Sequence, residues 1–359
     1  MILTKEDVRK CLDHVKRLQT VCPLIDIHVS PYEVIFNEFD YERNPQFEGV
    51  FSITNERYTP PSIGPIRLES RSGKKPNKKH EEISWLISLM LYRKLYAHIG
   101  PRIFIDQMNL SGLSKVLLLP VVHPSSHGVE QVRWMFDLYK GDERFLFGYC
   151  IPNSVRDQDI LPVIKNAIRD YQIKAIKVHP NITGIDLATK KGKQRIESIL
   201  DACQKARMPL IIHGGVSPVL KNPGAKNYAS LDNLGQIKWA MMDTPLVISH
   251  AGMMGCSVAE AKEKMPLLKR ILAANDNVMI DISALGVDVL CLIFKQIDHQ
   301  KILFGSDAIY FAQWSAVANF FYALRESVSN PEDSFIRIAG MNPAICLFPE
   351  SGELKGKRP

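Results

Sequence analysis

The chain has 359 residues, of which 46% are hydrophobic and 23% are charged, as is usual for a soluble globular protein. It contains no run of about 18 or more apolar residues, and its first residues are not a basic segment followed by an apolar one, so we expect a cytoplasmic protein that neither spans a membrane nor carries a signal peptide. The seven cysteines are scattered and form no Cys-x-x-Cys pair, so neither disulfides nor a thiolate metal site is expected.

The net charge of +7 comes from two short segments. Four lysines lie within residues 74–79 and three basic residues within 355–358, and these seven charges account for the whole excess. No aromatic residues alternate with the lysines, so we expect a solvated loop and a flexible tail at 349–359 rather than a surface for nucleic acid or membrane. The expected partner is a small-molecule substrate, and a homo-oligomer remains open.

The first part of the chain predicts a helix, a strand and then a long irregular segment. Residues 4–20 have helical spacing, and residues 24–28 form a short apolar strand. Residues 30–80 contain six prolines and show only weak periodicity, and helical spacing returns over 81–99. We expect residues 30–100 to be an insertion that follows the first strand and serves as a lid or a substrate wall.

From residue 115 onwards, strand and helix patterns alternate. Strands are predicted at 116–122, 145–151, 175–178, 209–213, 245–249, 278–282 and 302–305. Helices are predicted between them at 129–139, 157–171, 190–206, 231–242, 257–274 and 287–297, with two bracing helices at 311–327 and 331–347. With the first strand this makes eight strands, which favours the α/β class and a single (β/α)8 TIM barrel over 1–359 rather than an open doubly wound sheet.

Four of the apolar runs end on a histidine or an aspartate. They are Leu24-Ile25-Asp26-Ile27-His28, Pro209-Leu210-Ile211-Ile212-His213-Gly214-Gly215, Pro245-Leu246-Val247-Ile248-Ser249-His250-Ala251-Gly252 and Lys301-Ile302-Leu303-Phe304-Gly305-Ser306-Asp307. Because the carboxyl ends of all barrel strands meet at one face, these side chains are expected to lie together. Two or three imidazoles with one carboxylate form a divalent metal site suited to zinc, manganese or iron.

These motifs resemble the amidohydrolase superfamily, and specifically the amidohydrolase-related (amidohydrolase 2) branch. The segments at 175–180 (AIKVHP) and 340–348 (GMNPAICLF) extend the resemblance over residues 24–348. This branch includes small-molecule hydrolases and non-oxidative decarboxylases. One departure matters, because the first strand of the family usually ends in His-x-His, whereas this chain has His28-Val29-Ser30. Since a hydroxyl is a poor zinc ligand beside an imidazole, we expect three protein ligands rather than four.

The resemblance implies a role for each polar residue at the strand ends. His28, His213 and Asp307 match the metal ligands of the family, and Asp307 also matches the carboxylate that shuttles a proton. His250 matches a histidine that orients water or polarises the substrate. Asp26 has the spacing of a carboxylate that supports the ligands from behind.

Several other residues have two interpretations. Lys177 and His179 either contact the substrate or are an inward lysine paired with a carboxylate and a histidine at the rim. Ser30 replaces a ligand, bonds a metal-bound water or is inert. Arg67 and Arg71 either clamp an acidic substrate or lie on the surface. His80 is a further candidate for the clamp, and His123 and His127 are candidates for the same rim.

Three functional hypotheses follow. The first is a metal-dependent hydrolase of a small molecule with an amide, ester or lactone-type bond, in which one divalent ion, with zinc as the first candidate and manganese or iron as alternatives, activates water, Asp307 moves the proton, and His250 with the metal stabilises the oxyanion. The second keeps the site for non-oxidative decarboxylation of a small carboxylic acid, and the Ser30 departure motivates it. The third is a non-catalytic barrel that serves as a binding protein.

Overall fold

The computed structural model describes residues 5–30, 101–121, 128–217, 223–308 and 313–348. Apart from Ser30, the expected insertion lies outside these ranges, as does the tail. Arg67, Arg71, His80, His123 and His127 lie outside them too. None of the helices within the described ranges is long and apolar enough to cross a membrane.

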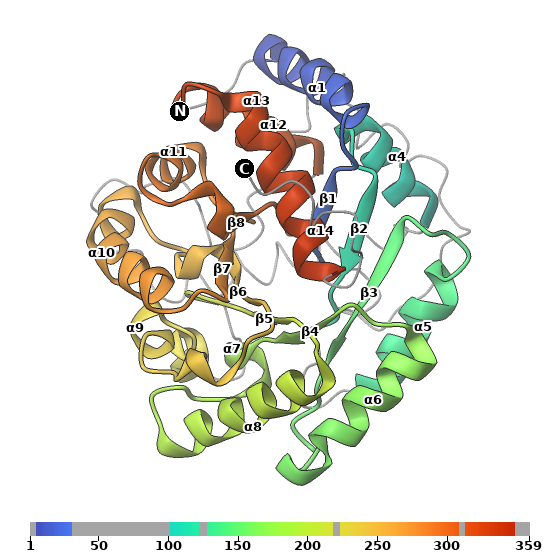
Figure 1. Ribbon diagram of the computed structural model, residues 1–359, viewed down its shortest axis with the longest axis vertical. Coiled ribbons are helices and arrows are strands. Elements are labelled where there is room, and N and C mark those ends of the chain that lie inside the picture. Colours follow the sequence, from blue (N-terminus) through green and yellow to red (C-terminus); the bar gives the residue numbers. More distant parts are fainter. Residues whose placement is uncertain (1–4, 31–100, 122–127, 218–222, 309–312, 349–359) are drawn as a thin grey trace.

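Eight parallel strands form the barrel in chain order, each paired with the next (Figure 1). They are β1 (Ile25–Val29), β2 (Lys115–Leu118), β3 (Phe145–Cys150), β4 (Ala175–Val178), β5 (Leu210–Ile212), β6 (Leu246–Ile248), β7 (Val278–Asp281) and β8 (Ile302–Leu303). Between Asp26 and Val29, β1 advances three residues while β2 advances two, which makes a β-bulge in the segment that contains His28. The predicted (β/α)8 barrel is confirmed.

The last strand returns to the first, which closes the barrel. The backbone N–H of Ile27 donates to the carbonyl of Phe304 over 3.1 Å, and the N–H of Asp307 donates to the carbonyl of His28 over 2.8 Å. A parallel bridge between Val29 and Ala308 continues this seam. The bonds bring the end of β8 against the end of β1, so His28 and Asp307 share one rim.

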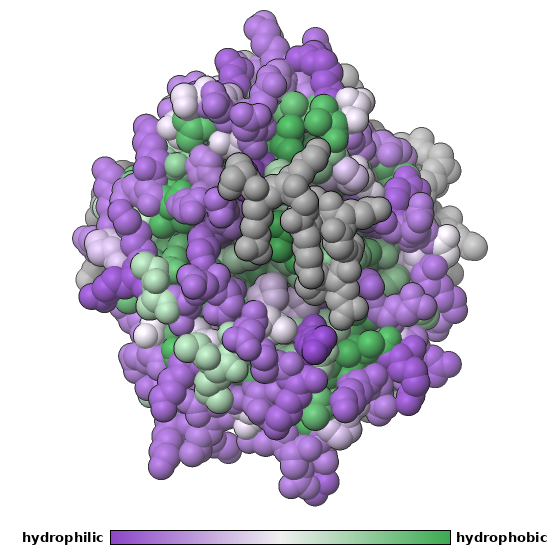
Figure 2. All heavy atoms as spheres, in the orientation of Figure 1, coloured by the Kyte–Doolittle hydropathy of each residue, from purple (hydrophilic) through white to green (hydrophobic). Residues whose placement is uncertain are grey.

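Helices surround the strands and bury their apolar faces on them (Figure 1). Those of the described ranges are α1 (Lys5–Gln19), α4 (Pro101–Ser111), α5 (Gly128–Tyr139), α6 (Ile160–Tyr171), α7 (Pro180–Thr183), α8 (Lys190–Ala206), α9 (Leu231–Leu234), α10 (Val258–Ala274), α11 (Val287–Gln296), α12 (Gln313–Arg325), α13 (Pro331–Ile336) and α14 (Asn342–Leu347). Side-chain hydrogen bonds cap the amino-terminal ends of several of these helices. Thr189 caps α8, and Ser257 and Glu260 form a capping box at the start of α10. The surface in the same orientation is mainly hydrophilic over these helices (Figure 2).

Two predicted helices differ from the structure. The helix expected over 231–242 stops at Leu234, where Gly235 caps α9, and only a short 3-10 turn (Trp239–Met241) follows. Glycine in a helix interior costs about 1 kcal/mol relative to alanine, which favours ending the helix there. The helix expected over 331–347 is interrupted by a π-helical turn (Arg337–Met341), which lies next to a proline that has no N–H for the helical ladder.

An apolar layer fills the half of the barrel at the amino-terminal ends of the strands. Its members are Ile25, Ile27, Leu117, Leu119, Leu146, Ala175, Ile211, Val247 and Leu303. Two residues of α14, Cys346 and Leu347, belong to the same cluster, and α14 lies across the barrel in Figure 1. The barrel is therefore a packed core closed at this end, and the opposite, carboxyl-terminal end of the strands is left for polar groups.

Candidate active site at the carboxyl-terminal rim

A layer of polar side chains lies directly above the apolar layer. In β4 and β7, and directly after β5 and β6, a polar residue stands two positions after an apolar residue that belongs to or packs against that layer. Because alternate residues of a strand face the same side, both residues of each pair face into the barrel. The pairs are Ala175 and Lys177, Ile211 and His213, Val247 and Ser249, and Met279 and Asp281. All four polar side chains are buried. His28 on β1 and Asp307 after β8 complete the ring from the closing seam.

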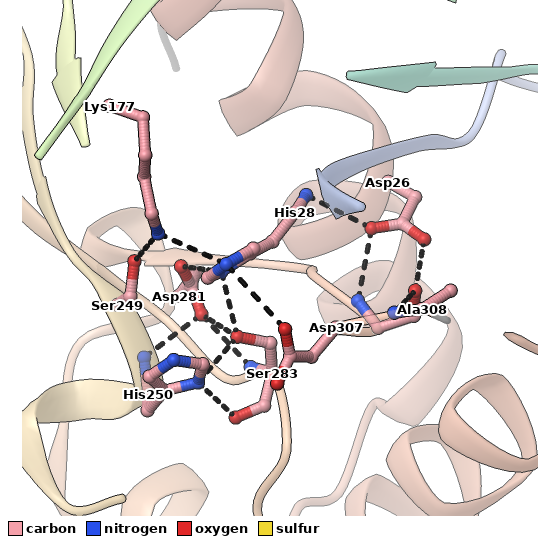
Figure 3. Close-up of polar contacts among 10 residues, drawn as sticks. Asp26, His28, Lys177, Ser249, His250, Asp281, Ser283, Asp307 and Ala308 are labelled. Carbon is pink, nitrogen blue, oxygen red and sulfur yellow. Dashed lines mark hydrogen bonds and ion pairs between the residues drawn. The ribbon is translucent and has the colours of Figure 1, made fainter. Parts of the chain in front are cut away.

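A buried carboxylate holds the ring of His28 (Figure 3). Nδ1 of His28 lies 3.0 Å from Oδ2 of Asp281. Because an ionised carboxylate only accepts hydrogen bonds, Nδ1 carries the proton and Nε2 keeps its lone pair. Burial lowers the pKa of His28, so the ring is neutral near neutral pH.

Asp281 also holds the rim that follows β6. Its Oδ1 accepts from the backbone N–H groups of His250 and Ser283, each over 3.0 Å, and from the hydroxyl of Ser283. Burial alone raises the pKa of Asp281, but the hydrogen bond from His28 and the positive charge of Lys177 hold that pKa below its ordinary value. Asp281 is therefore an ionised carboxylate that ties β7 to both β1 and β6.

The ring of His250 has a defined tautomer as well. Its Nδ1 lies 3.0 Å from the carbonyl of Ser283 and 2.8 Å from the hydroxyl of the same residue. A carbonyl only accepts, so Nδ1 of His250 carries the proton. Burial lowers the pKa of His250 to about 3, so at neutral pH the ring presents Nε2 as an acceptor. This geometry suits orienting a water molecule rather than donating to an oxyanion.

Two polar residues of this rim, His250 and Asp307, have a left-handed backbone that is unusual outside glycine. The φ angle is 56° at His250 and 59° at Asp307. Each conformation is held by a backbone hydrogen bond, from the N–H of His250 to Asp281 and from the N–H of Asp307 to the carbonyl of His28. Backbone strain of this kind gathers at functional sites, where it aims a side chain that a relaxed backbone would not.

Asp307 and His28 face each other without a direct hydrogen bond. Oδ1 of Asp307 lies 3.7 Å from Nε2 of His28, which exceeds hydrogen-bond length. Burial raises the pKa of Asp307 well above its ordinary value, although the charge of Lys177 opposes this shift. The carboxyl group therefore keeps a proton more readily than an ordinary aspartate does.

Lys177 is the cation of the site. Its Nζ lies 3.0 Å from Nε2 of His28 and 3.1 Å from the hydroxyl of Ser249, and the residue is 1% exposed (Figure 3). Burial lowers the pKa of Lys177 to about 8, while the charges of Asp281 and Asp307 act in the opposite direction. Since Nε2 of His28 carries no proton, Lys177 is the donor in that contact.

His213 reaches the site from β5 without a partner for one of its nitrogens. Its ring stacks on His179 with 3.9 Å between ring centroids, and its edge meets His250 at 4.9 Å. Its Nε2 is buried and has no hydrogen-bond partner among the described residues. Burial lowers the pKa of His213 well below its ordinary value, so the ring is neutral. A buried ring nitrogen left unpaired costs free energy, which a metal ion offsets by binding it.

Asp26 and Ser30 lie in the seam between β1 and β8. Oδ1 of Asp26 accepts from the backbone N–H groups of His28 and Ser306, over 3.1 and 3.0 Å, and Oδ2 accepts from Ser306 Oγ and Gln313 Nε2, over 2.5 and 2.9 Å. Burial raises the pKa of Asp26 to about 6. Both oxygens are used in fixing the backbone beside His28, and Ser30 is buried at the same seam.

Close backbone approaches at the rim require glycine. A Cβ added to Gly305 meets Cβ of His28 at 2.6 Å, and one added to Gly214 meets Cα of Gly252 at 2.8 Å. The first glycine lets β8 pass beside His28, and the second lets the loops after β5 and β6 touch. These two positions set the spacing of the rim.

The donor set suits a divalent metal ion. Neutral imidazoles and a carboxylate are ligands that zinc, manganese and iron share. One atom each of His28, His250 and Asp281 lie within 4.8 Å of one another, but Nδ1 of both rings and both oxygens of Asp281 already hold hydrogen bonds. This group therefore supports the rings from behind. The atoms left as candidate metal ligands are Nε2 of His28, Nε2 of His213 and the carboxylate of Asp307.

Most of the residues singled out from the sequence lie around one point. His28, Lys177, His250 and Asp307 share contacts, and His213 reaches them through its edge contact with His250. His179 stacks on the outer side of His213 and its Nδ1 accepts from the N–H of Ile182 over 3.4 Å, so it caps α7. Arg67 and Arg71 lie outside the described residues.

Three residues of the site were not singled out from the sequence. They are Ser249, Asp281 and Ser283. Asp281 lies in Val278-Met279-Ile280-Asp281-Ile282-Ser283, where a charged residue interrupts an apolar strand. A carboxylate inside a buried strand is itself a signal, because such groups are rarely buried without partners.

Comparisons with known proteins agree with this fold. The sequence profile of the family described as Amidohydrolase matches residues 122–344. A sequence comparison with curated proteins gives no match. Among solved structures, an amidohydrolase from Burkholderia multivorans with bound HEPES is 14% identical over 90% of this chain and 99% of its own, with a TM-score of 0.55.

Two further structures resemble the chain. A crystal form of the Burkholderia multivorans amidohydrolase with bound zinc is 15% identical over 71% of this chain and 90% of its own, with a TM-score of 0.50. The 5-carboxyvanillate decarboxylase of Sphingomonas paucimobilis is 11% identical over 91% of this chain and 99% of its own, with a TM-score of 0.54. Because the sequence identities are this low, these comparisons show a likeness of fold alone.

Proposed function

Because this chain belongs to the amidohydrolase family, we propose that it is a metal-dependent hydrolase of a small molecule with an amide, ester or lactone-type bond. One divalent ion, with zinc as the first candidate, is held by Nε2 of His28, Nε2 of His213 and the carboxylate of Asp307. The zinc in the Burkholderia multivorans amidohydrolase supports that choice of metal.

One observation carries the metal site, which is the unpaired Nε2 of His213. This nitrogen is buried on the same rim as the lone pair of His28, and the carboxylate of Asp307 lies 3.7 Å from that lone pair. Both rings are neutral because burial lowers their pKa values, so neither needs to lose a proton before it binds a cation. The hydrogen bond from His28 to Asp281 is the arrangement that raises the basicity of a ligating imidazole.

A divalent ion supplies Lewis acidity, which lowers the pKa of a bound water from 15.7 towards about 7. The side chains perform the remaining steps. Nε2 of His250 accepts a hydrogen bond from the attacking water and orients it, since Nδ1 is held by Ser283. Asp307 accepts the proton of that water and then donates it to the leaving group.

Substrate contacts are assigned to residues beside the metal ligands. Lys177 and His179 are candidate substrate contacts, and Arg67 and Arg71 are retained as predicted clamps for an acidic group. An N–H donor from Lys177 is well placed to bind a carboxylate or carbonyl oxygen once its present contacts are broken.

Metal content in the wild-type protein and in His213→Ala tests the proposal. The protein is purified without a metal-affinity tag and its metals are measured by inductively coupled plasma mass spectrometry, with His14→Ala as a control because His14 lies on α1, remote from the rim. We expect close to one ion per chain in the wild type and the control, and a loss in His213→Ala. Retention in His213→Ala with loss in Asp281→Asn assigns the ion to the His28, His250 and Asp281 group instead.

Non-oxidative decarboxylation is the second candidate for the same site. The raised pKa of Asp307 favours it, because a protonated carboxyl group is able to deliver a proton to carbon, and Ser30 in place of the second histidine leaves room for a substrate carboxylate. Release of carbon dioxide from hydroxybenzoate-like acids distinguishes it from hydrolysis. A protein that holds no metal and turns over neither class of substrate is a binding protein.

A further inference from the structure

The side chain of Lys177 lies where a metal ion at the rim needs a ligand. Nζ of Lys177 donates to Nε2 of His28 over 3.0 Å, and this nitrogen is the only acceptor that the ring offers, because Nδ1 is protonated and bonded to Asp281. One lone pair serves one partner. A lysine donor and a metal ion therefore exclude each other at His28.

Charge reinforces this exclusion. Lys177 is 1% exposed, and its position next to Asp281 and Asp307 gives it the two carboxylates that a divalent ion also needs. A second cation at contact distance in a buried site meets strong Coulomb repulsion, since little water screens it. The lysine must turn away before an ion binds.

We propose that Lys177 is a resident cation of the site, which neutralises the buried carboxylates when no metal is bound and is displaced from His28 when a divalent ion enters. The inference rests on the metal site proposed above. Metal binding is then an exchange of cations, so its affinity is set by how firmly Lys177 is held as well as by the ligands. Ser249 supplies the second anchor of Lys177, and it directly follows β6 beside the site.

Nζ of Lys177 occupies the place beside Nε2 of His28 where an ion bound to that nitrogen would lie. His213 and Asp307 are not part of the closely spaced His28, His250 and Asp281 group, although both border the same rim.

Metal affinity in Lys177→Met tests this inference without relying on turnover. The dissociation constant for Zn²⁺ is measured by competition with a chromophoric chelator in the metal-stripped wild type, in Lys177→Met and in Lys177→Gln. Both variants remove the charge, and glutamine keeps a donor. Lys174→Met is the control, because this substitution removes the same charge away from the rim. Lys174 precedes β4 at the opposite end of the strand, and its Nζ lies over the ring of Phe348.

We expect Zn²⁺ to bind at least tenfold more tightly to Lys177→Met than to the wild type, with an intermediate gain in Lys177→Gln and no change in Lys174→Met. Equal or weaker binding in a folded Lys177→Met refutes the cation exchange and leaves the metal site standing. Absence of Zn²⁺ binding in every variant refutes both proposals. If Lys177→Met does not fold, an unchanged affinity in a folded Lys177→Gln is the refuting result.

Discussion

Replacing Asp281 with asparagine changes one contact of the site while keeping its shape. The amide oxygen of the introduced side chain is able to accept from the backbone N–H groups of His250 and Ser283, as Oδ1 of the carboxylate does over 3.0 Å. The amide nitrogen then faces Nδ1 of His28, where the carboxylate accepts a hydrogen bond over 3.0 Å in the wild type. Two donors oppose each other at that point.

No rearrangement of the His28 proton removes this conflict. If the proton moves from Nδ1 to Nε2, the ring meets the Lys177 donor instead, since that contact is 3.0 Å long. One charge-assisted hydrogen bond is lost in either case, which corresponds to about 2–3 kcal/mol. For a chain of 359 residues, this destabilisation lowers the melting temperature by roughly 3–4 °C.

Two measurements check this prediction. Thermal unfolding of the metal-free protein reports the stability, and ¹⁵N chemical shifts of histidine-labelled protein report which ring nitrogen of His28 carries the proton. We expect Asp281→Asn to change the tautomer of His28 and to weaken Zn²⁺ binding about 10–100-fold. Asp26→Asn is the matched control, because that buried carboxylate bonds the backbone N–H of His28 but not its ring. The reasoning fails if Asp281→Asn keeps the proton on Nδ1 and binds Zn²⁺ as the wild type does.

Three other outcomes are expected. The metal-free protein loses stability as the pH falls below about 6.5, because four buried imidazoles have lowered pKa values and take up protons only on unfolding. Asp26 and Asp307 have raised pKa values and bind protons in the folded state, which reduces this dependence as the pH falls further. The slope, measured by urea unfolding, is therefore at most about 5.4 kcal/mol per pH unit, which is the value for four imidazoles alone. The four are His28, His179, His213 and His250. Gly305→Ala forces a Cβ within 2.6 Å of His28 and is expected to cost about 1–3 kcal/mol and lower the metal content, whereas Gly141→Ala, with open space around it, changes neither. Removing the ion with a chelator lowers the stability by about 2.7 kcal/mol relative to protein at a free metal concentration 100 times the dissociation constant, which calorimetry detects.

The barrel was predictable because its signal is repetitive. Strand and helix patterns alternate regularly from residue 115, and each short apolar run buries both faces, as strands of a parallel barrel do. Features that depend on one residue were harder to predict. Helical spacing over 231–242 continues past Gly235, yet the structure ends α9 there because the spacing does not record the helix-breaking effect of one glycine.

The site was predicted in its positions but not in its contacts. His28, His213, His250 and Asp307 were predicted because each of them ends an apolar run in the sequence. Asp281 was not predicted, because it stands within the apolar run of β7 rather than at its end. It faces inward, as does Met279 two positions earlier, which packs on the apolar layer. The contact of Lys177 with His28 joins residues 149 positions apart and depends on a side-chain rotamer, so spacing in the sequence carries no information about it.

The polar layer of the barrel is costly for stability, and this cost bears on whether the chain is a catalyst or a scaffold. The interior of such barrels is usually filled with branched apolar side chains, whereas this layer holds an ammonium and carboxylates whose desolvation is unfavourable even when they are paired. The left-handed backbones of His250 and Asp307 add about 1–2 kcal/mol each at the same rim. A barrel that only bound a partner on its surface would gain from apolar residues at all these positions. Because the unfavourable features gather around one unpaired imidazole nitrogen, on His213, they favour a site that binds a metal ion and acts on a substrate.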